Sequence, residues 1–334
     1  WQYPYAITHA TDIGYDLQTS LILSDQNGQP LAPVAQRLVS GEGSYATYQE
    51  VNPIPIVKPH LDEVTSCIQY LETQGFSKPL VHIIDREGDS VGHIRTWDAA
   101  DCLWLVRARD NPHVEYKGKS QSCKAVAQEL TFEKSREVSY HGKPCWQWVA
   151  EIPVRLIRPA KPSQKKGKKP AVPGIPVAAQ LVVSRILSDT GEVLAEWLLL
   201  TNVTAMDVAT IALWYFWRWQ IECFFKLLKS AGHHLESWQQ ESAIAIAKRL
   251  LVASMACVTV WAIAADKSKE ATELRVFLIK LSGRQMRHKK EFTSPALLAG
   301  LWVFISMLEV IEAYSEDELD KLKATARQFL GKVV

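Results

Sequence analysis

Four residues between positions 215 and 229 have types and a spacing that could do chemistry on a phosphate group. They form the pattern Tyr-x2-Arg-x3-Glu-x6-Lys, with members Tyr215, Arg218, Glu222 and Lys229. If the segment is one α-helix, offsets of 0, 3, 7 and 14 residues fall within a stripe about 60° wide. The other face is apolar, which suits a helix docked on a core. The pattern predicts a helix that presents one acid between two bases, as needed to hold a metal ion beside a phosphodiester.

A second acid strengthens this interpretation. Asp85 ends the short apolar run of HIIDREGD, where a strand would stop at the edge of a sheet. Two carboxylates, Asp85 and Glu222, could bind two Mg2+ ions about 3.5–4 Å apart and so activate a water or a 3′-hydroxyl. Such a site normally has a third acid. Simpler explanations stay open: Asp85 in a polar turn, and Glu222 as a helix-surface partner of Arg218 and Lys226.

The elements around Asp85 alternate between strands and helices, which predicts a mixed sheet covered by helices. The DQNG turn signal at 25–28 joins two strands into a hairpin. Strands are expected at 17–24, 31–39, 80–85 and 102–107, and helices at 61–73 and 90–100.

The following stretch reads as β-rich, and the rest of the chain as helical. Strands are expected at 137–140, 145–157, 177–187 and 193–201, with a Pro/Lys/Gly loop at 159–174. Helices are expected at 205–231, 240–266, 270–281, 293–312 and 316–329. The predicted organisation is a core at 1–110, a β-rich insertion at 111–202, a core helix with the catalytic Glu at 203–232 and a helical region at 233–334.

Composition indicates a globular protein but does not show whether it binds nucleic acid. The chain has 334 residues, 47% hydrophobic content and a net charge of only +2, so it is globular and not strongly basic overall. Basic runs at 152–188 and 280–290 are compatible with a DNA-binding groove or with solvated loops. Six cysteines without a CxxC pair indicate reduced thiols and no zinc site. No signal peptide is visible, and the apolar stretch 250–265 is expected to be a buried helix.

The strand-end DREGD and the Tyr-Arg-Glu-Lys spacing together resemble the DDE transposases of insertion-sequence family four, the class containing the transposon-five enzyme. The resemblance covers most of residues 10 to 232. It implies that Asp85 is the second catalytic Asp and Glu222 the catalytic Glu, both also metal ligands. It implies contacts with transposon-end phosphates for Tyr215, Arg218 and Lys229, and base stacking for Trp197. Arg86 and Lys226 are further expected DNA contacts. A core role for Trp197 stays open.

The resemblance implies a ribonuclease-H-like α/β fold with a β-rich insertion and a helical C-terminal region. It implies metal-dependent phosphoryl transfer, namely nicking, hairpin formation, hairpin opening and strand transfer. The expected cofactor is Mg2+, with Mn2+ as an alternative. The expected partners are double-stranded transposon ends, target DNA and a second copy in the DNA complex, in the bacterial cytoplasm.

One departure from the family pattern affects activity. The family's first Asp is expected upstream of Trp1, and neither Asp12 nor Asp16 ends an apolar strand. The chain is therefore expected to lack one metal ligand and the family's N-terminal DNA-recognition region. Three alternatives stay open: a DNA-binding derivative that cannot cut, a ribonuclease-H-like nuclease without strand transfer, and a structural protein with a chance motif.

Overall fold

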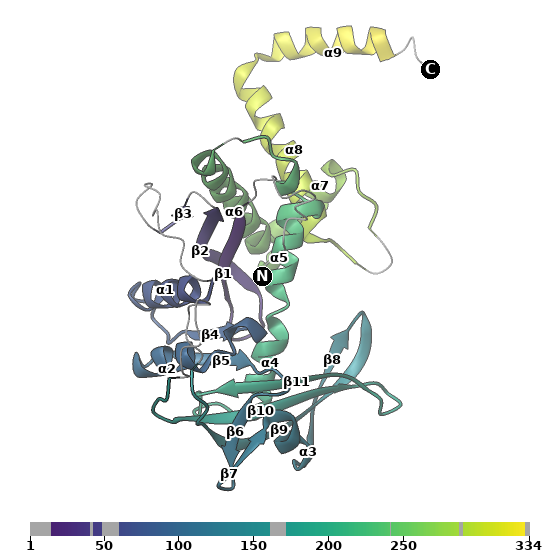
Figure 1. Ribbon diagram of the computed structural model, residues 1–334. Coiled ribbons are helices and arrows are strands. Elements are labelled where there is room, and N and C mark those ends of the chain that lie inside the picture. Colours follow the sequence, from purple (N-terminus) through teal and green to yellow (C-terminus); the bar gives the residue numbers. More distant parts are fainter. Residues whose placement is uncertain are drawn as a thin grey trace. The chain divides into compact units, whose positions relative to one another are not determined.

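The computed structural model describes residues 15–40, 43–48, 60–160, 172–240, 242–286 and 290–330. The chain divides into two compact units. One consists mainly of Pro53–Trp219, and the other mainly of Leu17–Leu38 and Gln220–Val334. We describe each unit by itself (Figure 1).

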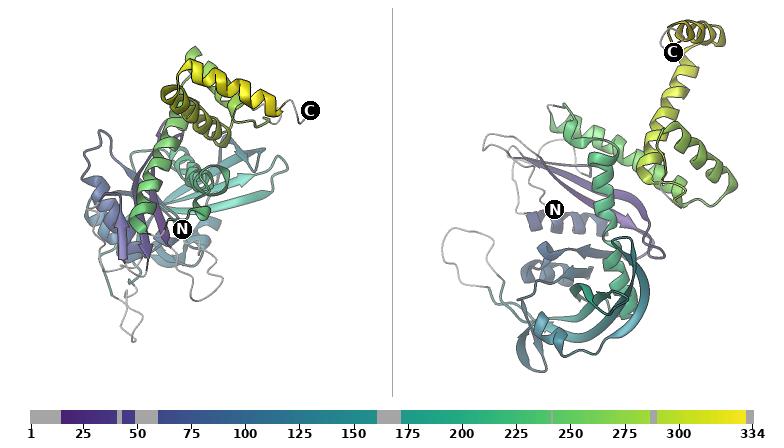
Figure 2. Two further views of the ribbon diagram at one scale, coloured as in Figure 1. Left: turned by 90° about the horizontal axis from the view of Figure 1, so that it is seen from above. Right: turned by 90° about the vertical axis from the view of Figure 1, so that its right-hand side faces the viewer.

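The first unit is built on a large mixed sheet. Its strand order is β4-β5-β11-β10-β9-β6-β7, and β8 pairs with β9. Only the β4–β5 pair among these is parallel, and the long strands curl strongly (Figure 2). The strands are β4 (Val81–Ile84), β5 (Leu103–Arg107), β6 (His113–Tyr116), β7 (Lys119–Ser122), β8 (Glu133–Tyr140), β9 (Lys143–Leu156), β10 (Val177–Leu187) and β11 (Val193–Thr201).

Helices cover both faces of this sheet because its central strands are apolar on both sides. Trp104 and Val106 of β5 pack in one cluster, while Leu105 between them packs in another. The first cluster contains residues of α1 (His60–Glu72), α2 (Val91–Ala99) and α3 (Cys123–Gln128). The second contains residues of α4 (Val208–Trp217). The alternation along β5 therefore fixes which helix covers which face.

The second unit combines a small sheet with helices. The small sheet has the strands β1 (Asp16–Leu23), β2 (Pro30–Ser40) and β3 (Gly43–Ala46), in the order β1-β2-β3; most of their residues belong to this unit, and Asp16 and Val39–Ser44 are assigned to the first. Its helices are α5 (Gln220–Lys226), a π-helical turn (Leu227–Ala231), α6 (Ala243–Ala265), α7 (Lys269–Leu281), α8 (Ser294–Ala313) and α9 (Glu316–Leu330). A 3-10 turn, Leu235–Ser237, precedes α6. The core of this unit joins Phe224 and Leu228 to residues of α6, α7 and α8.

Two helices of the second unit keep one face apolar and exposed. By length and composition, α6 and α8 could each cross a membrane, but core helices of soluble proteins meet the same criterion. The stretch 250–265, expected to be a buried helix, lies in α6 and is buried on one side only: Leu250 and Cys257 are buried, whereas Leu251 and Met255 are exposed.

The long helix expected over 205–231 is not one helix. It consists of α4, a turn at Arg218 and Trp219, then α5 and the π-helical turn. At the break, Arg218 N–H donates to the carbonyl of Tyr215, three residues back. No Pro or Gly marks this point in the sequence, so helical periodicity alone missed it. The boundary between the two compact units falls directly after it, between Trp219 and Gln220.

Candidate active site

Asp85 directly follows β4 and opens a short 3-10 turn, Arg86–Gly88. Its Oδ1 accepts a hydrogen bond from the Glu87 amide at 2.9 Å. The turn packs tightly against the strand before it, because a Cβ on Gly88 would lie 2.6 Å from the Cγ2 of Ile84. Glu87 is itself paired with His60 of α1 at 2.7 Å. The chain therefore fixes the Asp85 carboxylate at the edge of the sheet.

Arg107, which the sequence analysis did not single out, belongs to the same edge. In the parallel β4–β5 pair, Ile84 is in register with Val106, so Asp85 and Arg107 are the next residues on each strand. Both strands end there, and the carboxyl ends of parallel strands meet at one edge. The signal in the sequence is the position of Arg107 at the end of the buried run CLWLVR.

Tyr215 extends from α4 onto this edge. The residue is 4% exposed, so its hydroxyl is buried at this edge. Burial raises the pKa of Tyr215. The positive charges of Arg218 and Arg107 and a hydrogen bond with Arg107 lower it, and the charge of Asp85 raises it. The Arg218 guanidinium lies 5.9 Å from the centre of the Tyr215 ring. The structure thus brings together Asp85, Arg107, Tyr215 and Arg218 within the first unit.

Trp197 lies in β11, next to the same group. Its ring centre is 5.7 Å from that of Tyr215 and 6.2 Å from that of Phe216. The side chain is half-buried and packs at the border of two apolar clusters. The hydrogen bond from the Ala108 amide to the Leu198 carbonyl, 2.8 Å, ties this part of β11 to the end of β5. Arg86, also on this edge, is exposed.

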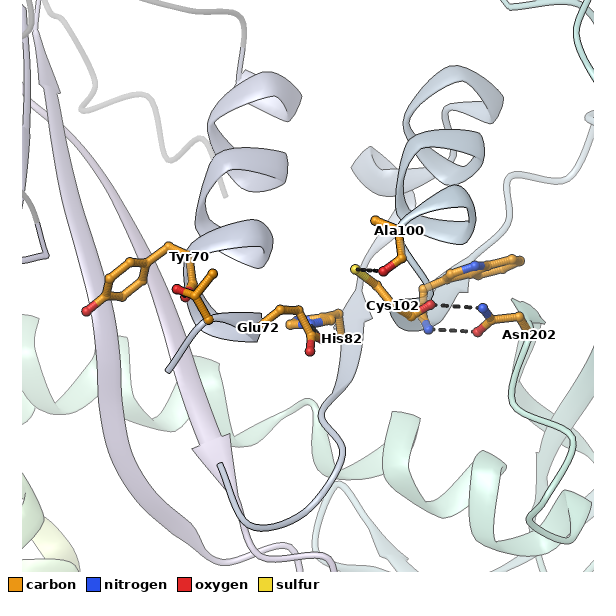
Figure 3. Close-up of polar contacts among 8 residues, drawn as sticks. Tyr70, Glu72, His82, Ala100, Cys102 and Asn202 are labelled. Atoms are coloured by element: carbon orange, nitrogen blue, oxygen red, sulfur yellow. Dashed lines mark hydrogen bonds and ion pairs between the residues drawn. The ribbon is translucent and has the colours of Figure 1, made fainter. Parts of the chain in front are cut away.

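Polar contacts at the opposite ends of these strands hold β4 and β5 in place (Figure 3). His82 of β4 pairs with Glu72 of α1 at 2.7 Å. Burial lowers the pKa of His82, and the hydrogen bond and charge of Glu72 oppose that shift. The side chain of Asn202 bonds to β5 as a neighbouring strand would. Its Nδ2 donates to the backbone carbonyl of Cys102 at 2.9 Å, and its Oδ1 accepts from the backbone N–H of Trp104 at 2.9 Å.

The other candidate residues lie in the second unit. Glu222 and Lys226 occupy α5, where Glu222 is half-buried and Lys226 is exposed. Lys229 lies in the π-helical turn, and its Nζ is 3.0 Å from the carboxylate of Glu236. Isolated π turns occur frequently at functional sites. The candidates therefore divide between the units: Asp85, Arg86, Trp197, Tyr215 and Arg218 in the first, and Glu222, Lys226 and Lys229 in the second.

Comparison with known proteins gives the family of this chain. Residues 51–258, more than half of the chain, match the family described as the transposase DDE domain. The chain belongs to the DDE transposase family. No curated protein matches the chain significantly. The family excludes the chance-motif alternative, and the substrate of this transposase is DNA.

The family also confirms the expected fold class. This transposase has a mixed α/β architecture with a ribonuclease-H-like DDE domain and a helical C-terminal region. The β-rich stretch contains β6, β7 and α3, which the sequence analysis missed. The two strands are short and polar, and they join through Lys117 and Gly118, both at positive φ (50° and 72°). Asn-Gly is the usual signal for such a turn, and Lys-Gly does not carry it.

DDE transposases generally use divalent metal ions, so the donor atoms must suit such an ion. The carboxylates of Asp85 and Glu222 are hard oxygen donors, which Mg2+ prefers. Oδ2 of Asp85 receives no hydrogen bond from the described part of the chain, which suits a ligand position. Among the described residues, no group of three or more His, Cys, Asp or Glu could hold a metal ion. Asp12 lies outside the described residues, and Asp16 is exposed at the start of β1.

Proposed function

We propose that this DDE transposase belongs to insertion-sequence family four and catalyses cut-and-paste transposition of a bacterial insertion sequence. The observation that carries the proposal is the Asp85 edge, where a strand-end carboxylate lies beside Arg107 and the buried Tyr215. The spacing from Tyr215 through Arg218 and Glu222 to Lys229 supports the choice of family.

In this proposal Asp85 and Glu222 hold Mg2+, and Mn2+ is an alternative ion. When bound, the metal would activate the attacking water or 3′-hydroxyl and stabilise the leaving oxygen. The chain's own contribution is to position the DNA. Arg218 can clamp phosphate oxygens with two parallel hydrogen bonds, and Arg107 lies on the same edge as Asp85. Lys226, Lys229 and Arg86 supply further positive charge toward the backbone.

The reaction steps we propose are nicking at the transposon 3′ end, hairpin formation, hairpin opening and strand transfer. A hairpin needs a base to leave the stack. The half-buried Trp197 offers a flat surface for that base, and stacking on an aromatic ring is worth about 1–3 kcal/mol. This offsets part of the cost of flipping the base out.

The proposed partners are the double-stranded terminal repeats of the transposon, the target DNA and a second copy of this chain. The helical second unit has a surface that suits protein contact, because α8 exposes Trp302, Val303, Met307, Leu308, Val310 and Ile311. Exposed apolar areas of this kind mark interaction sites in soluble proteins. We place the transposase in the bacterial cytoplasm, associated with the nucleoid when bound to DNA.

Two alternatives must be distinguished from this proposal, and the first is favoured because the described residues contain no group of three acids that could hold a metal ion. One is a derivative that binds transposon ends without cutting them. The other is a ribonuclease-H-like nuclease that cuts without strand transfer. Joining of a cut end to a target plasmid distinguishes the transposase from both.

The experiment that tests the proposal removes one carboxylate at a time. Glu222→Gln and Asp85→Asn should each abolish metal-dependent nicking of end-bearing DNA while end binding persists, because each amide keeps the shape and loses the charge. Glu273→Gln on α7, which breaks an exposed ion pair with Lys269, is the matched control and should nick normally. Nicking that survives in either of the first two variants would refute the metal role.

A further inference from the structure

Asp89, four residues after Asp85, is an acid for which the proposed reaction has no use. Its side chain is 0% exposed and forms an ion pair with Arg158, whose side chain is 18% exposed. Its other carboxylate oxygen accepts from the Arg109 amide at 2.8 Å. A buried charge is costly unless it is paired and hydrogen-bonded, and here both carboxylate oxygens have partners.

The contacts of Asp89 fix the end of the turn that begins with Asp85. The Asp89 amide donates to the carbonyl of Arg86 at 3.4 Å, and the side chain of Arg109 donates to the same carbonyl. Gly88, between Arg86 and Asp89 in the turn, lies against Ile84 and Val106. The five-residue turn DREGD thus has one carboxylate at the sheet edge and one directed into the protein as an anchor.

Arg158 is itself held in place by helix α2. It follows β9, and its carbonyl accepts from the side chain of Arg95 in α2 at 2.9 Å. Arg95 also donates to the carbonyl of Ile175 at 2.9 Å. The segment just after β9 and the segment just before β10 are therefore both bonded to α2. The end of the turn is therefore tied to β9, to α2 and to the residues after β5.

We propose that Asp89 and Arg158 are positioning residues, which orient the Asp85 carboxylate for divalent metal by anchoring the far end of its turn. The inference rests on the proposed role of Asp85. It predicts that loss of the pair weakens metal use without weakening DNA binding. Removing hydrogen-bond partners that orient metal ligands commonly lowers metal affinity by about 10–100-fold.

The test compares Asp89→Asn, Arg158→Met and Arg158→Lys with the unmodified transposase. The Mn2+ concentration for half-maximal nicking of end-bearing DNA should rise about tenfold in Asp89→Asn and Arg158→Met, with the rate at saturating Mn2+ and end binding little changed. Arg158→Lys keeps the charge and should recover most of the loss. Glu115→Gln, which breaks an exposed ion pair with Arg155 of β9, is the matched control and should not change the metal dependence.

A second readout needs neither metal nor activity. Hydrogen exchange of the segment 84–90, followed by mass spectrometry without DNA or Mn2+, should be faster in Asp89→Asn and Arg158→Met, because the turn is no longer anchored. If Asp89→Asn does not fold, the two Arg158 variants carry the test. If the variants exchange at the wild-type rate and keep the wild-type Mn2+ dependence, the inference is overturned, even if their melting temperature is lower. Nicking that persists in Asp85→Asn would instead overturn the proposed function.

Discussion

The Lys229 ammonium lies 3.0 Å from the Glu236 carboxylate, and the Lys229 side chain is 23% exposed while that of Glu236 is 60% exposed. A phosphate that binds Lys229 must therefore compete with an exposed carboxylate. Exposed ion pairs contribute only about 0.2–1 kcal/mol, so DNA can displace Glu236 at small cost. At the residue scale, Lys229 can pair with Glu236 when DNA is absent and with a phosphate when DNA is bound.

Lys229→Ala should weaken binding of transposon-end DNA and make its salt dependence shallower. Removal of one phosphate interaction reduces the slope of log K against log salt by about 0.9 on duplex DNA. Glu236→Gln should have the opposite effect on affinity, because it removes the competing charge. Binding titrations at several salt concentrations measure both. Lys269→Ala on α7 is the control, and an unchanged slope in Lys229→Ala would exclude the phosphate interaction.

At the scale of the elements, the contact between α1 and β4 includes the buried imidazole of His82, which pairs with Glu72. Burial lowers the pKa of His82 below its ordinary value of 6.5. The unfolded chain therefore takes up a proton at a higher pH than the folded chain. The stability that neutral His82 contributes is fully present above pH 6.5 and is lost as the pH falls through the folded pKa.

His82→Gln should remove this dependence. The free energy of unfolding of the unmodified chain should fall more between pH 7.5 and pH 5.5 than that of the variant, with a difference in slope of at most about 1.4 kcal/mol per pH unit. Urea titrations at several pH values give this comparison. His113→Gln, at an exposed histidine of β6, should behave like the unmodified chain. Parallel pH profiles for His82→Gln and the unmodified chain would contradict the assignment.

Strong periodic patterns in the sequence predicted most elements of the fold, and departures have local physical causes. The strands expected at 177–187 and 193–201 match β10 and β11 residue for residue, because both are mainly apolar segments separated by turn residues. The break at Arg218 and Trp219 could not be predicted, since it depends on a shift of backbone hydrogen bonds and not on a helix-breaking residue. For the site, the strand-end position indicated Asp85 and the helical spacing indicated Tyr215, whereas Arg107 needed the β4–β5 register.

At the scale of the whole molecule, the second unit exposes more apolar helix surface than solubility favours. Along α8, Ile311 is 59% exposed and follows Met307 by one helical turn. In Figure 1, α9 continues from the end of α8 in a different direction. An interface with a second copy would cover the apolar side of α8, as in the DNA-bridged dimer that we propose.

Ile311→Glu should reduce the fraction of DNA complexes that contain two protein copies, because it places a charge in the apolar face. Mass photometry of the transposase with end-bearing DNA measures that fraction. Ile175→Glu, at an exposed apolar residue of the first unit, is the matched control. A normal fraction of two-copy complexes in Ile311→Glu would mean that this face is not the interface.

The most direct test of the account asks whether Asp85 and Glu222 hold the same metal. Fe2+ substituted for Mg2+ generates hydroxyl radicals with ascorbate and peroxide, and these cut the polypeptide next to the bound ion. Mapping of the fragments should show cuts within a few residues of both acids, and Asp85→Asn should remove both sets. Cuts near one acid alone, or cuts near Glu222 that persist in Asp85→Asn, would contradict the shared site.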